Sequence, residues 1–107
     1  MGILSKIFGK KDELGQAFET VNRLENNPEK LNAYLNALEH LAVISKTRRM
    51  FSVAAETYER IADVYELPDE KFKASGCIGI GHNKMMARSY RERSEELKRN
   101  HPEQFRA

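Results

Sequence analysis

Apolar residues recur at helical spacing along almost the whole chain, and no stretch alternates between apolar and polar residues as a β-strand would. Residues three and four apart share one face of a helix, so this period marks the side that turns inward. The first such helix is predicted to begin after Asp12, which can cap it, and to end at residues 26–28. Its predicted inward positions are Leu14, Ala17, Phe18, Val21 and Leu24.

Two more helices are predicted in the middle of the chain. Asn27 can cap the second helix, and Pro28 lies near its first turn. This helix fades at residues 46–49, where positive charges suit a helix C-terminus. The third helix runs from about Met50 to Tyr65. The predicted inward positions are Leu31, Tyr34, Leu35, Leu38, Leu41, Ala42 and Ile44 in the second helix, and Phe51, Ala54, Ala55, Tyr58, Ile61, Ala62 and Tyr65 in the third.

The last helical stretch, residues 70–99, contains the glycine-rich sequence GCIGIGHN at residues 76–83. A dinucleotide-binding loop needs a third glycine and a preceding strand, and both are missing. In one long helix the three glycines would cost roughly 3 kcal/mol relative to alanine. A turn at residues 81–83 explains Gly81 as a helix terminator and Asn83 as the next cap. We expect the turn, and one long helix remains the alternative.

A repeated pattern of large and small residues favours helical hairpins. Leu38-x2-Leu41-Ala42-x2-Ser45, then Phe51, then Ala54-x3-Tyr58, resembles the helix-turn-helix pattern of the tetratricopeptide family. A step of about 34 residues, the length of that repeat, carries Leu38 and Ala42 to Phe72 and Gly76, again large and then small. The resemblance spans residues 38–99 but departs from the family at Leu38, which replaces tryptophan, at Ser45, which replaces tyrosine, and after Gly76.

The predicted fold class is therefore all-α, with antiparallel helical hairpins arranged either as tetratricopeptide-like repeats or as a four- or five-helix bundle. The resemblance implies a protein-protein interaction module, an adaptor or scaffold that binds a peptide or partner protein in a helical groove. The binding face that it implies consists of Asn36, Glu39, Val43 and Lys46 from one hairpin and Lys73 and Cys77 from the next. Two hairpins are fewer than a solenoid normally needs, so a homodimer is also expected.

Residues 1–11 form an amphipathic, basic segment before a single helical domain at residues 12–99 and a C-terminal tail at residues 100–107. The segment has one apolar face and three lysines with no acid. Such a segment attaches a protein to an anionic membrane surface or docks on the protein's own core or on a partner. The candidate membrane contacts are Ile3, Leu4, Ile7 and Phe8.

The net charge of +2 is unevenly distributed, with five net positive charges in residues 71–107. Lys84, Arg88 and Arg91 share one helix face near Tyr90, which makes them candidate anion contacts and suggests nucleic-acid binding as another alternative. However, Arg88 and Arg91 each have a glutamate four residues later, a pattern typical of a solvated helix. Nucleic acid is accordingly not favoured as a partner.

Residues suited to catalysis or metal binding are sparse. The single cysteine, Cys77, excludes an intrachain disulfide and fits a reducing compartment. In a continuous helix Cys77 and His82 face different ways, and the three histidines lack metal-ligand spacing. No apolar run reaches the roughly 20 residues that span a bilayer. We expect a protein without enzymatic activity, metal or cofactor, located in the cytoplasm, or at the membrane surface if residues 1–11 bind lipid.

Overall fold

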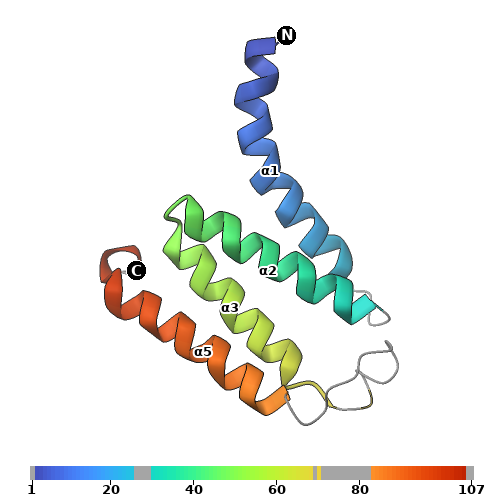
Figure 1. Ribbon diagram of the computed structural model, residues 1–107, viewed down its shortest axis with the longest axis vertical. Coiled ribbons are helices and arrows are strands. Elements are labelled where there is room, and N and C mark those ends of the chain that lie inside the picture. Colours follow the sequence, from blue (N-terminus) through green and yellow to red (C-terminus); the bar gives the residue numbers. More distant parts are fainter. Residues whose placement is uncertain (1, 26–29, 69, 71–82, 106–107) are drawn as a thin grey trace.

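The computed structural model describes residues 2–25, 30–68, 70 and 83–105, and the side chains from residue 13 onward. These residues form the helices α1 (Gly2–Glu25), α2 (Leu31–Thr47), α3 (Phe51–Tyr65) and α5 (Asn83–Asn100), followed by the short 3₁₀ helix η3 (Pro102–Gln104). Figure 1 shows that each helix runs opposite to the one before it along the chain. The described part of the chain contains no β-strand. The prediction of an all-α fold built from antiparallel hairpins is confirmed.

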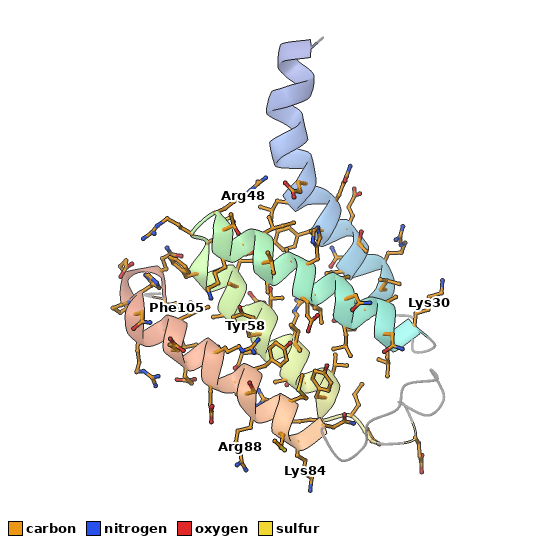
Figure 2. The ribbon with its side chains drawn as sticks, viewed as in Figure 1. Lys30, Arg48, Tyr58, Lys84, Arg88 and Phe105 are labelled. Carbon is orange, nitrogen blue, oxygen red and sulfur yellow. The ribbon has the colours of Figure 1, made fainter. Side chains whose placement is uncertain are left out.

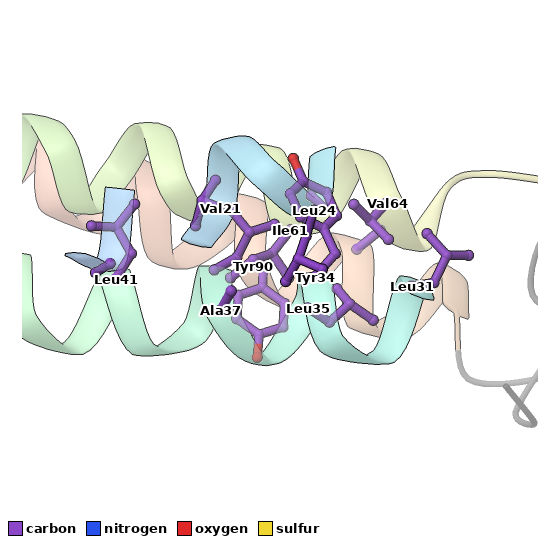
Figure 3. Close-up of a cluster of buried hydrophobic side chains, with 14 of the residues drawn as sticks. Val21, Leu24, Leu31, Tyr34, Leu35, Ala37, Leu41, Ile61, Val64 and Tyr90 are labelled. Carbon is purple, nitrogen blue, oxygen red and sulfur yellow. The ribbon is translucent and has the colours of Figure 1, made fainter. Parts of the chain in front are cut away.

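The helices pack in chain order, with α1 on α2, α2 on α3, and α3 on α5. One apolar core contains residues from α1, α2, α3 and α5, and Figure 3 shows its side chains meeting between the ribbons. Leu38 and Ile61 are its largest fully buried residues, with none of their surface exposed. The predicted inward positions of α2 are all buried, and those of α3 are buried or half-buried. Helical periodicity therefore identified the inner face of both central helices.

A tight turn joins α2 to α3. The Met50 N–H donates to the Ser45 carbonyl at 2.8 Å, and the Arg49 N–H donates to the Lys46 carbonyl at 3.0 Å. These two bonds define a Schellman motif, which satisfies carbonyls that the end of a helix leaves without partners. The motif needs a left-handed residue, and Arg49 takes this role with φ of 59°. Glycine is the usual residue at that position because it lacks a Cβ.

The end of the chain contacts the start of α3. The Gln104 side-chain oxygen accepts hydrogen bonds from the backbone N–H groups of Phe51 at 2.8 Å and Ser52 at 3.3 Å. The Gln104 amide donates to the Arg49 carbonyl at 2.9 Å. The His101 ring stacks on the Phe51 ring with centroids 3.7 Å apart. Residues 101–105, which were assigned to a tail, therefore lie against the α2–α3 turn.

Two details of the first helix differ from the prediction. α1 begins at Gly2, so Asp12 lies inside the helix and does not cap it. Residues 2–12 contain no proline, and their apolar residues keep the helical period, so nothing ends the helix there. Phe18 was predicted to face inward but is 38% exposed, because the inner stripe of α1 passes through Ala17, Val21 and Leu24.

The glycine-rich stretch is described only at its last residue. Residues 71–82 lie outside the described residues, and with them Phe72, Gly76 and the first two residues of the turn predicted at 81–83. α5 begins at Asn83, one of the residues assigned to that turn.

Candidate functional site

A groove of about 1180 Å³ follows α5 from its first residue almost to its last. One end is formed by the residues that close α3, and the long side is formed by α5. The described lining residues are Tyr65, Glu66, Leu67, Asn83, Lys84, Ala87, Arg88, Arg91, Glu92, Glu95, Glu96 and Arg99. We call this surface the α5 groove.

Its lining combines apolar side chains with balanced charge. Tyr65 is half-buried and Leu67 is 37% exposed at the α3 end, while Ala87 is buried beside them. The four basic residues that line the groove are matched in number by four glutamates. Figure 2 shows the side chains of Lys84 and Arg88 pointing away from the packed helices. The groove therefore offers apolar contact together with charges of both signs.

Arg91 binds three acidic side chains of α3 and its C-terminal turn. Its guanidinium nitrogens lie 3.0 Å from a Glu59 oxygen and 2.9 Å from an Asp63 oxygen, and they also pair with Glu66. The hydrogen bonds that Arg91 donates, first to Asp63 and second to Glu66, raise the pKa of Arg91 above its usual value. The sequence had suggested an ion pair between Arg91 and Glu95, but the acids that Arg91 contacts come from another helix. Arg91 therefore joins α3 to α5, and its single positive charge already faces three carboxylates.

The sequence carried a signal for this cluster that the sequence analysis missed. Glu59, Asp63 and Glu66 are spaced four and three residues apart, so they form one acidic stripe along α3. A row of three acids facing one way favours a basic residue on a neighbouring helix. The spacing could reveal the stripe, but it could not reveal that Arg91 lies opposite.

Three tyrosine rings fill the space between α3 and α5. Tyr90 lies with its ring centroid 5.8 Å from that of Tyr58 and 6.1 Å from that of Tyr65. Its hydroxyl donates a 2.6 Å hydrogen bond to a carboxylate oxygen of Glu39 on α2. Burial, followed by this hydrogen bond, raises the pKa of Tyr90 well above its usual value. Tyr90 thus ties α5 to α2 across α3.

The partner-binding residues predicted on α2 lie on a surface of their own. Asn36, Glu39, Val43 and Lys46 are all exposed, and none of them lines the α5 groove. Val43 is 62% exposed, while Glu39 holds the Tyr90 hydroxyl. We call these four residues the α2 stripe. The other two predicted contacts, Lys73 and Cys77, lie outside the described residues.

The structure brings together the three candidate anion contacts, Lys84, Arg88 and Arg91, in the α5 groove. It brings the same number of acids into that groove as bases, so the local field is not that of a polyanion site. The candidate membrane contacts, residues 3, 4, 7 and 8, lie in the first half of α1, where the backbone alone is described. A second hollow of about 170 Å³ between α1 and α2 is smaller than typical ligand pockets.

Within the described residues, no three or more histidine, cysteine, aspartate or glutamate side chains gather in a way that could hold a metal ion. None of the helices in the described ranges combines the length and the apolar character needed to cross a bilayer.

Comparisons of the chain with protein-family models, with curated proteins and with solved structures find no match.

Proposed function

We propose that this chain is a protein-binding module that holds a helical segment of a partner protein in the α5 groove. The observation that carries the proposal is the groove itself, which runs beside α5 from Asn83 to Arg99. At a rise of 1.5 Å per residue this distance is about 24 Å, enough for roughly four turns of a bound helix. An amphipathic helix that lies in an apolar groove is a recurring mode of peptide recognition.

The lining of the groove favours a protein over a nucleic acid. A phosphate backbone is bound by a surface with excess positive charge. Here four bases are matched by four acids, and Arg91 is already paired with three carboxylates. A partner helix that carries both signs of charge beside an apolar face complements this lining.

The packed hairpins also support a tetratricopeptide-like arrangement, for which the partner-binding face would include the α2 stripe together with Lys73 and Cys77. We place the partner in the α5 groove instead for two reasons. Val43 is the only apolar member of the stripe, and a single exposed apolar residue is ordinary on a protein surface. The Glu39 carboxylate is engaged by Tyr90. The α5 groove, by contrast, is a hollow lined by Tyr65, Leu67 and Ala87 together.

Two matched double variants distinguish these surfaces. Leu67→Ser with Arg88→Glu removes an exposed apolar side chain and reverses one charge in the α5 groove. Val43→Ser with Lys46→Glu makes the same kinds of change in the α2 stripe. All four positions are exposed, so each variant is expected to keep the fold.

The probe is a set of peptides selected from a displayed random library with the full chain as bait. Their affinities for the wild type and the two variants are then measured by fluorescence anisotropy. We expect the groove variant to weaken binding at least about tenfold and the stripe variant to change it less than about twofold, since hot-spot residues dominate binding. Peptides that lose affinity only for the stripe variant, or for neither variant, would contradict the proposal.

The expected homodimer and the cytoplasmic location stay predictions.

A further inference from the structure

The first half of α1 extends beyond the other described helices. α1 begins at Gly2, whereas its buried contacts with the core come from Ala17, Val21 and Leu24 in its second half. Figure 1 shows the first half of α1 projecting past the end of α2, with none of the other labelled helices beside it. Packing against the other described helices therefore does not explain why the first half of α1 is helical.

The sequence places one apolar face on that projecting half. Ile3, Leu4, Ile7 and Phe8 fall on the same side of the α1 backbone at helical spacing. Phe18 follows Ile7 by about three turns, so it lies on nearly the same face, and its side chain is 38% exposed. Lys11, four residues after Ile7, lies on the same face, so the apolar residues of this face stand on both sides of a lysine.

The charge of the same segment identifies what can cover this face. Residues 1–11 contain Lys6, Lys10 and Lys11 and no acidic residue. A second copy of this segment would bring the same three positive charges, which repel. An anionic lipid surface offers negative headgroups for the lysines and an apolar layer beneath them for the apolar face. The three lysines and the apolar face of residues 1–11 therefore both favour an anionic lipid surface.

We propose that the first half of α1 binds the surface of anionic membranes, with its apolar face toward the acyl chains and its lysines near the headgroups. This inference does not depend on the proposed function of the α5 groove, because it concerns the opposite end of the chain. It assigns the projecting half of α1 the task of holding the packed helices at a membrane.

Co-sedimentation of the full chain with vesicles tests this proposal. One set of vesicles is phosphatidylcholine with about one third phosphatidylglycerol, and the other is phosphatidylcholine alone. We expect binding to the anionic vesicles, weakened by salt, and no binding to the neutral ones. Changing Ile7 and Phe8 to serine is expected to weaken binding more than about tenfold, because the apolar contact is lost.

The contribution of charge is tested with two triple variants of equal charge. Changing Lys6, Lys10 and Lys11 to glutamine is expected to lower the partition by about two orders of magnitude, at about fivefold for each lysine near an anionic surface. The control changes Lys84, Arg88 and Arg99, three exposed bases on α5, to glutamine and is expected to alter partition less than about threefold. Far-ultraviolet circular dichroism verifies that every variant remains helical.

Three results would overturn the proposal. The first is equal loss of binding in the two triple variants, which would indicate attraction by net charge alone. The second is unchanged binding after the change at Ile7 and Phe8. The third is the absence of binding by the wild type to anionic vesicles.

Discussion

At the scale of single residues, the most informative positions are those where an ordinary side chain occupies an unusual setting. Arg49 has a left-handed backbone, and Tyr90 is a buried phenol that faces a carboxylate. Both are understood from elementary chemistry: a Cβ is strained at positive φ, and a buried phenol resists ionisation. Each leads to a measurable change in stability.

Replacing Arg49 with glycine should stabilise the fold. Relief of the left-handed strain is worth about 1 kcal/mol, and the lost stacking of Arg49 over the Phe51 ring costs about 0.5 kcal/mol. The net gain in the free energy of unfolding is thus about 0.5 kcal/mol, measurable by urea denaturation. The matched control is Arg48→Gly, where φ is −88° and glycine should destabilise. A gain at position 48, or a loss at position 49, would contradict this account of the turn.

The raised pKa of Tyr90 predicts that the fold loses stability at alkaline pH. Its pKa is raised in the folded state, so both states keep the proton below the usual pKa of 10.0. Above that pH the unfolded chain ionises first, and the free energy of unfolding falls as pH rises. Tyr90→Phe should cost about 1 kcal/mol at neutral pH through the lost bond to Glu39, and its stability should fall less steeply above about pH 10. Denaturation curves with the same alkaline slope in both proteins would show that Tyr90 does not contribute.

At the scale of helices, the ends of the elements depend on contacts that are distant in sequence. Met50 precedes α3 but makes no side-chain capping bond. Gln104 supplies this bond instead, by accepting from the first two N–H groups of α3. The last described segment of the chain therefore stabilises the middle of the fold.

Gln104→Ala should lower the free energy of unfolding by about 1 to 2 kcal/mol, because two N–H groups lose their acceptor, as when a capping side chain is removed. Gln104→Glu keeps the acceptor and loses the donor to the Arg49 carbonyl, so a smaller effect is expected. The neighbouring Glu103→Ala, at an exposed position, serves as the control and should change stability by less than about 0.5 kcal/mol. Equal losses in Gln104→Ala and Glu103→Ala, measured by urea denaturation, would rule out the capping role.

These examples show which parts of the fold the sequence could predict. Periodicity identified the buried faces of α2 and α3 because burial is read along one helix at a time. It could not reveal that Gln104 caps α3, because 53 residues separate Gln104 from Phe51. Periodicity also did not predict that α1 begins at Gly2. An aspartate such as Asp12 can cap a helix, so it suggested a helix start although it lies inside α1.

The candidate site was predictable to a similar extent. Lys84, Arg88 and Arg91 were recognised as one face of a helix, and the structure places them together. Their acidic counterparts lie partly on another helix, and the sequence does not specify which helix faces pack together. The groove results from that packing, so its existence could not be read from either helix alone.

At the scale of the whole molecule, the two proposed binding surfaces lie at the two ends of the helix order. The packed core of α1, α2, α3 and α5 holds the α5 groove on one side. The first half of α1 projects at the other end of this order (Figure 1). If both proposals hold, the packed core lies between a bound partner and the membrane surface.

The central claim is that the α5 groove receives the partner. The most direct measurement is backbone nuclear magnetic resonance of the full chain, titrated with a peptide selected from the displayed library. We expect the largest shift changes in residues 83–99 and at Tyr65 to Leu67, which line the groove. Changes concentrated in residues 36–46 of α2, with those of α5 unchanged, would contradict the claim.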